Sequence, residues 1–167
     1  MSFLQRTGEL KFAAALGAAL AISACAKAPA ETADSLAGLN GGRAAPGSPR
    51  DFAVNAGDRV FFDSDSSELT QTAQTTLVKQ VSWLQQYGRY NLTVEGHADE
   101  RGTREYNFAL GARRAETTKD YLVARGIPTA RIRTISYGKE RPVATCNDVS
   151  CWSQNRRAVT MLTGGQS

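Results

Sequence analysis

The segment VEGHADERGTREYNFALGARRAETTKDYL, residues 94–122, predicts a strand, a polar loop and a helix in succession. Its first residues complete a short apolar strand, predicted over residues 92–95, that breaks at Gly96. A polar loop follows, and Thr103 then has the type of side chain that caps the first turn of a helix. A loop rich in Asp, Glu and Arg between a strand and a helix is a place where binding groups usually lie. We therefore expect the functional site in this loop and in the helix that follows it.

The predicted helix has two distinct faces. One face is expected to pack on a sheet, because its members recur every three or four residues; they are Phe108, Gly111, Ala115, Thr118 and Leu122. The other face is mostly polar and consists of Thr103, Asn107, Leu110 and Arg114. Asp99 lies in the loop just before this second face. A carboxylate and a guanidinium at one rim suit a zwitterion, whose ammonium would bind Asp99 and whose carboxylate would bind Arg114 in a bidentate manner.

A structural interpretation of the same two residues is open at this point. Asp99 can cap a turn, and Arg114 can be a solvated helix charge. Neither residue belongs to the apolar stripe, so alanine at either position is expected to leave the fold and its melting temperature almost unchanged. Arg113 is the natural control, because one residue along a helix turns the side chain by about 100°.

Four motifs follow one another in a fixed order between residues 60 and 162. They are GHADERGTREYN at 96–107, LGARRA at 110–115, ISYGKERP at 135–142 and NRRAV at 155–159. In these motifs the chain resembles the OmpA-like peptidoglycan-binding domain family, and within it the outer-membrane lipoproteins that act with the Tol proteins. The resemblance covers most of the chain that follows the amino-terminal segment. It implies that Asp99 and Arg114 grip the diaminopimelate of the wall peptide.

The resemblance also assigns further residues to the site. Asp65, in the turn after the first strand, matches a family position that lines the pocket, whereas Ser64 stands where relatives carry a bulkier apolar residue. Arg156 is expected to lend positive charge nearby. The full set of expected binding residues is Asp65, Asp99, Thr103, Asn107, Leu110 and Arg114. No cofactor or metal is expected, since His97 is the only histidine and no further ligands lie at a suitable spacing.

The first 24 residues are predicted to be a signal peptide rather than part of the fold. Two basic residues precede a short apolar run at 12–22, which is too short to span a bilayer. The run ends in ISAC at 22–25, which resembles the bacterial lipobox. The resemblance implies that Cys25 is acylated and anchors the chain in the outer membrane, on its periplasmic side. An ordinary secretory signal with an incidental cysteine is the alternative.

Residues 25–56 predict a flexible tether, because they are rich in Ala, Gly, Ser and Pro and show no apolar periodicity. Residues 57–167 predict one α/β domain. Its elements are expected in the order strand, helix, strand, helix, strand, strand, with the helices packed on one sheet. The first helix is expected to begin after Thr70, with an apolar face formed by Leu69, Ala73, Leu77, Val81 and Leu84. The family resemblance implies a mixed sheet.

Cys146 and Cys151 flank four residues near the carboxyl terminus. In an exported protein such a pair predicts a disulfide. Half of a metal site is the alternative, although the sequence contains no second cysteine pair to complete it. We therefore expect Cys146 and Cys151 to be bonded to each other.

Composition and motifs restrict the function further. The net charge of +4 is too small, and the basic residues are too evenly mixed with acids, to indicate nucleic acid. No catalytic motif such as GxSxG, HExxH or a P-loop occurs. The resemblance implies a non-enzymatic anchor that binds peptidoglycan, with periplasmic Tol proteins as partners, in envelope constriction during cell division and in envelope integrity. A peptidoglycan hydrolase or its activator, and a lipoprotein whose pocket no longer binds, are the alternatives.

Overall fold

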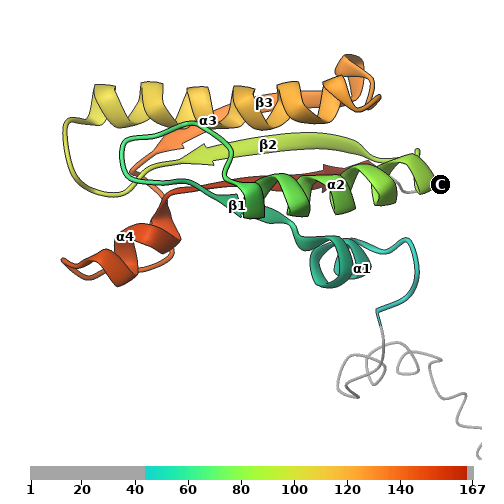
Figure 1. Ribbon diagram of the computed structural model, residues 1–167, viewed down its shortest axis with the longest axis horizontal. Coiled ribbons are helices and arrows are strands. Elements are labelled where there is room, and N and C mark those ends of the chain that lie inside the picture. The colour runs from blue at the N-terminus through green and yellow to red at the C-terminus, as the bar shows by residue number, and fades with distance from the viewer. Residues whose placement is uncertain (1–43, 165–167) are drawn as a thin grey trace, which may run out of the picture. The chain divides into compact units, whose positions relative to one another are not determined.

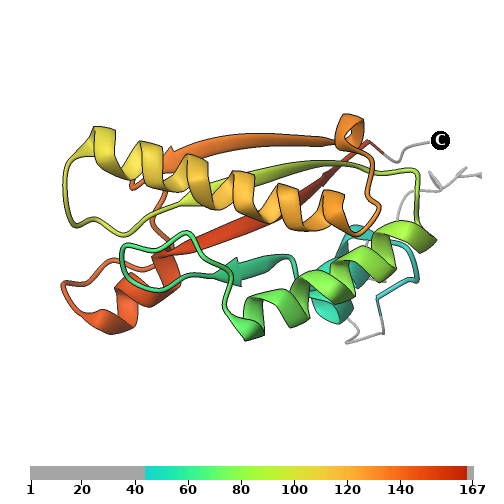
Figure 2. The same ribbon diagram turned by 45° about the horizontal axis from the view of Figure 1, so that its top comes forward.

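The computed structural model describes residues 44–164, which form an α/β domain with two layers. A four-stranded sheet forms one layer, and the helices α2 (Gln71–Gln86) and α3 (Arg104–Ala124) cover one of its faces (Figure 1, Figure 2). The strands are β1 (Arg59–Phe61), β2 (Asn91–His97), β3 (Ile132–Gly138) and β4 (Arg157–Thr163). The short turns α1 (Pro49–Asp51), η1 (Phe52–Gly57) and η2 (Thr129–Arg131), and the helix α4 (Val149–Asn155), complete the elements. The predicted order and fold class are confirmed.

The sheet is mixed, and its strands lie in the order β1-β4-β2-β3. β2 runs parallel to β3, while β4 runs antiparallel to both β1 and β2. The register pairs Phe61 with Arg157, and Gly96 with Ala158. The ends of β1 and β2 and the start of β4 therefore meet at one end of the sheet. The turns that follow β1 and β2 lie together at that end.

The predicted apolar face of α2 is confirmed. Thr70 caps the helix by accepting a hydrogen bond from the backbone N–H of Ala73 at 3.2 Å. Ala73, Leu77, Val81 and Leu84 are buried, and Leu69 packs partly against the same core. The core also contains Val60, Leu92, Val94, Ala115 and Leu122 from the strands and from α3. Each helix thus buries its apolar face against the same side of the sheet.

The prediction for α3 was wrong at its amino-terminal end. Phe108 is 57% exposed, although Gly111, Ala115 and Leu122 of the same stripe are buried as expected. A Cβ atom on Gly138 would come within 3.1 Å of the backbone of Phe108, so this part of the helix lies over β3. In the part of the chain that the structure describes, β3 is an edge strand and carries no neighbour on its outer side. The side chain of Phe108 therefore has nothing to cover it.

The expected break of the second strand at Gly96 was also wrong, because β2 continues to His97. Gly96 is required for a different reason, its close approach to α3. A Cβ atom at this position would come within 1.8 Å of the carbonyl oxygen of Gly111 on α3. The contact of two glycines brings the helix close to the strand. It thereby fixes α3 at Gly111 directly against β2 at Gly96.

The folded domain begins earlier than residue 57, so the predicted tether boundary was too late. Phe52 and Ala56 are 1% and 5% exposed and belong to the core. Asp51 accepts hydrogen bonds from the backbone N–H of Gly47 at 2.8 Å and from the indole N–H of Trp83 at 2.7 Å. Two core residues among Gly, Ala and Pro give no periodic signal, which is why the sequence did not reveal this segment. The predicted signal peptide, Cys25 and most of the tether lie outside the described residues, among which no helix is long and apolar enough to cross a membrane.

Candidate ligand-binding site

A cavity of about 280 Å³ lies at the end of the sheet where the turns after β1 and β2 meet the first turns of α3. Its lining residues are Ser64, Asp65, Asp99, Arg101, Gly102, Tyr106, Asn107 and Leu110. Four of the six predicted binding residues are among them: Asp65, Asp99, Asn107 and Leu110. Thr103 and Arg114 are not in the lining. Arg101 and Tyr106 were not predicted.

Asp99 is a buried carboxylate, only 6% exposed, with its partners on its own chain. Arg101 donates to Oδ1 through its backbone N–H at 3.2 Å and through Nε at 3.1 Å, and to Oδ2 through Nη2 at 2.7 Å. Arg156 adds a longer contact from Nη1 to Oδ2 at 3.4 Å. Burial by itself would raise the pKa of Asp99, but the hydrogen bonds and charge of Arg101, together with Arg156, outweigh it and lower the pKa. Asp99 is therefore an anion at neutral pH, and Arg156 supplies positive charge near it, as expected.

Arg101 forms the outer wall of the cavity. Its side chain is 43% exposed, and its Nη2 also donates to the hydroxyl of Ser64 at 2.8 Å. The guanidinium stacks on the ring of Trp152, 4.2 Å from the ring centroid. Only its place two residues after Asp99 in the loop could have indicated this role. Ser64 thus has a hydrogen-bond partner in Arg101.

Arg114 lies beneath the cavity and has no exposed surface. Its Nε and Nη1 donate to the backbone carbonyls of Ser66 and His97, each at 2.8 Å, and Nη2 donates to that of Asp63 at 3.1 Å. Burial and then the charge of Arg156 lower the pKa of Arg114 to about 10. Two of the five N–H groups of the guanidinium are not used by these carbonyls. Arg114 thus holds the turn after β1 against the end of β2, and these contacts favour a destabilising effect of its removal, in place of the earlier expectation that the fold is spared.

Residues at the start of α3 support the rim of the cavity through hydrogen bonds. Thr103 caps α3 by accepting from the backbone N–H of Tyr106 at 3.2 Å, and its own side chain is exposed. Asn107 is 2% exposed and donates from Nδ2 to the carbonyl of Arg101 at 2.7 Å, which fixes the loop. The hydroxyl of Tyr106 donates to the carboxylate of Asp65 across the cavity. The rim is therefore closed by hydrogen bonds from both turns.

His97 is buried beside the site and has a structural environment. Its ring stacks on Tyr137 with centroids 5.6 Å apart, and its Nε2 lies 3.8 Å from a carboxylate oxygen of Glu95, too far for a hydrogen bond. Neither ring nitrogen has a hydrogen-bond partner among residues 44–164. Burial, followed by the charges of Arg157 and Arg141, lowers the pKa of His97 to about 4, so the ring is neutral at pH 7. The same residues contain no group of three or more His, Cys, Asp or Glu side chains that could hold a metal ion.

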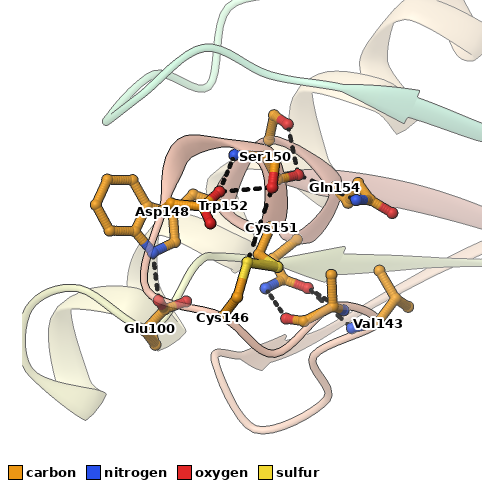
Figure 3. Close-up of a disulfide and its surroundings, with 11 residues drawn as sticks. Glu100, Val143, Cys146, Asp148, Ser150, Cys151, Trp152 and Gln154 are labelled. Carbon is orange, nitrogen blue, oxygen red and sulfur yellow. Dashed lines mark hydrogen bonds between the residues drawn. A yellow bond between two sulfur atoms is a disulfide. The ribbon is translucent and has the colours of Figure 1, made fainter.

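The structure joins Cys146 and Cys151 in a disulfide, with Cα atoms 5.7 Å apart (Figure 3). The bond closes the loop before α4 onto the first turn of that helix. From the same helix Trp152 points toward the loop after β2, where its indole N–H donates to the carboxylate of Glu100 (Figure 3). The disulfide-closed segment is thus in contact with the loop that carries Asp99.

Comparison with known proteins agrees with this architecture. The sequence profile described as the OmpA family matches residues 61–156. The chain belongs to the OmpA family. The peptidoglycan-associated lipoprotein of Mesorhizobium japonicum is 63% identical to this OmpA-family chain, with 92% of each protein covered. That of Pseudomonas aeruginosa is 44% identical, over 72% of this chain and 71% of the relative.

Two solved structures show the same fold. The crystal structure of the peptidoglycan-associated lipoprotein from Burkholderia pseudomallei matches with a TM-score of 0.65 and 35% identity, over 70% of this chain and all of that one. The carboxyl-terminal domain of Helicobacter pylori MotB matches with a TM-score of 0.59, over 64% of this chain and 84% of that one. At 20% identity, the second comparison concerns the fold alone.

Proposed function

We propose that this OmpA-family protein binds peptidoglycan non-covalently, through the diaminopimelate of the stem peptide. The relatives are named for their association with peptidoglycan, and the cavity has the chemistry that such a ligand needs. The free end of diaminopimelate carries an ammonium and a carboxylate on one carbon. Asp99 is the acceptor for the ammonium. Arg114 is fully buried and outside the cavity lining, so it acts on the carboxylate through its positive charge rather than through a direct hydrogen bond.

The observation that carries this proposal is the buried, ionised carboxylate of Asp99 in the lining of a cavity. Its lowered pKa keeps it negatively charged at the cavity wall, so its position favours a cationic ligand group. A hydrolase would need a general acid with a raised pKa, whereas the pKa of Asp99 is lowered. Binding therefore has more support than catalysis, and we propose that the protein is not an enzyme.

The remainder of the chain gives this binding a purpose. Acylated Cys25 would hold the amino terminus in the inner leaflet of the outer membrane, and the tether would let the domain reach the wall. The protein would then link membrane and wall and act with periplasmic Tol proteins in envelope constriction at division. In cells, the Cys25→Ser variant should leave the membrane fraction. Its retention there would contradict the anchor.

The test of the binding site is a pull-down on purified sacculi with wild type, Asp99→Ala and Asp120→Ala. Asp120 is an exposed carboxylate on α3 and serves as a matched control for the lost charge. Removing one partner of a desolvated charge pair costs about 2–5 kcal/mol, and tenfold weaker binding requires only about 1.4 kcal/mol. Asp99→Ala should therefore bind at least tenfold more weakly, while Asp120→Ala should bind like wild type.

Two further results decide between this function and its alternatives. Equal binding by Asp99→Ala and wild type would refute the grip on the ammonium. Release of muropeptides from sacculi by the wild-type protein would favour the hydrolase instead. Acylation of the free ammonium of a diaminopimelate peptide should weaken its binding to wild type, and should matter little to Asp99→Ala, which has already lost that contact.

A further inference from the structure

The carboxylate of Asp99 is saturated with hydrogen bonds from the protein itself. A carboxylate offers about four acceptor positions, two on each oxygen. Arg101 fills both positions on Oδ1 and one on Oδ2, and Arg156 reaches the other on Oδ2. An incoming ammonium group therefore finds no free acceptor position. One of the protein's own donors has to leave before the ligand can bind.

The two arginines differ in how easily they can leave. Arg156 is 8% exposed, and its Nε donates to the carbonyl of Phe62 at 3.0 Å, while Phe62 donates its backbone N–H to the carbonyl of Arg156 at 3.0 Å. This arrangement ties Arg156 to β1. The side chain of Arg101 is 43% exposed, lines the cavity, and has a single further hydrogen bond, to Ser64. A half-exposed ion pair is weak, so the side chain of Arg101 is the donor that can be displaced.

We propose that Arg101 is an internal competitor for the ligand: its guanidinium occupies the ammonium position on Asp99 in the empty site and leaves when a cationic ligand binds. The proposal rests on the binding function of Asp99 proposed above. Its consequence is selectivity, because only a ligand that brings its own positive charge can replace the guanidinium. A neutral, acylated ligand cannot compensate for the lost ion pair. The competition also lowers the apparent affinity by the fraction of molecules in which Asp99 is free.

The surroundings of Arg101 give the experiment a signal. The ring of Trp152 lies 4.2 Å from the guanidinium, and Trp152 also donates to Glu100, whose charge attracts Arg101. The chain has two tryptophans, and Trp83 is buried in the core away from the cavity lining. Movement of Arg101 changes the environment of Trp152 alone. Its fluorescence should therefore change when the ligand binds.

The test is an isothermal titration calorimetry experiment on the full-length chain in detergent with a muropeptide that ends in diaminopimelate, and with the same peptide acylated on its free amine. The emission of Trp152 is followed in parallel for the wild type. The variants are Arg101→Ala, Arg101→Gln and the control Arg104→Ala, whose side chain is 73% exposed and pairs with Glu140 outside the cavity lining. Arg101→Ala should bind the free peptide at least threefold more tightly than wild type. Arg101→Gln should lie between the two, and Arg104→Ala should remain within twofold of wild type. Selectivity against the acylated peptide should fall in Arg101→Ala.

Several outcomes would overturn the proposal. Weaker or unchanged binding by Arg101→Ala, with its melting temperature preserved, would mean that Arg101 supports the ligand or ignores it. An emission signal that is absent in wild type, or that persists in Trp152→Phe, would mean that Arg101 does not move from its ring. Asp99→Ala distinguishes a failure of the proposed binding function from a failure of the proposed competition. If Asp99→Ala binds the free peptide like wild type, the proposed function itself is wrong. If it loses binding while Arg101→Ala gains none, only the competition fails.

Discussion

Replacing Arg114 with alanine tests whether this residue holds the site together. The backbone carbonyl of His97 is buried and would lose its donor, which costs about 2 kcal/mol. The carbonyls of Asp63 and Ser66 are partly buried, so water can replace the guanidinium there, and each loss costs about 0.5 kcal/mol. Relief of the repulsion between Arg114 and Arg156 and the loss of side-chain packing act in opposite directions. We expect a destabilisation of about 3 kcal/mol, which lowers Tm by about 10 °C in a domain of this size.

The assay is urea unfolding followed by circular dichroism, with Arg113→Ala as the matched control. Arg113 is exposed on the same helix, so its substitution should change the free energy of unfolding by less than about 0.5 kcal/mol. Arg114→Lys should recover only part of the loss, because an ammonium cannot reach three separated carbonyls as a planar guanidinium does. If Arg114→Ala unfolds at the same urea concentration as Arg113→Ala, the three contacts contribute nothing and the reasoning is refuted. Loss of sacculus binding by Arg114→Ala has to be measured at a temperature where the variant is folded.

Three further outcomes are expected. The folded pKa of His97, about 4, lies below its ordinary value of 6.5, so the unfolded chain takes up the proton first and stability falls as pH drops below 6.5. By pH 5 the free energy of unfolding should have fallen by about 2 kcal/mol. Urea titrations at several pH values should show that His97→Phe no longer has this pH dependence. If the pH dependence is unchanged in His97→Phe, His97 is not its source. Phe52→Ala should lower the free energy of unfolding by about 3–5 kcal/mol, while Val54→Ala, at an exposed neighbouring position, should lower it by less than about 0.5 kcal/mol. Equal losses would mean that the folded domain begins after residue 56, as the sequence predicted. Reduction of the bond between Cys146 and Cys151 should cost about 2 kcal/mol and lower Tm by several degrees without unfolding the domain, and an unchanged Tm would count against this loop-closure account.

The sequence predicted the elements well where a regular period repeats. The apolar face of α2 and the order of the main elements along the chain follow from spacing alone, and the cap at Thr103 follows from its chemistry. It failed where a side chain is covered by a segment distant in the chain. Arg114 lies on a polar stripe of its helix, and the turn at 63–66 and the end of β2 bury it. Nothing local in the sequence indicates that contact.

In the candidate site, too, the sequence indicated some residues and missed others. Asp99, Asn107 and Leu110 lie on the elements that carry the family motifs, and the sequence indicated all three. Arg101 became important only through Ser64 and Trp152, which come from the turn after β1 and from α4. Phe52 is an isolated apolar residue among small ones, so no period reveals its burial. Contacts between distant segments, rather than propensities, account for what the sequence did not show.

The position of β4 has a consequence for how the protein is made. It is the last strand in the chain, yet it lies between β1 and β2, so neither of those two strands can pair with the other before it arrives. A growing chain that lacks residues 157–163 has only the β2–β3 pair of its sheet, and it has no Arg157 to align with Phe61. The residue just before β4 is Arg156, which contacts Asp99. The sheet therefore cannot be completed until the carboxyl-terminal strand has been synthesised, and the binding site is completed last.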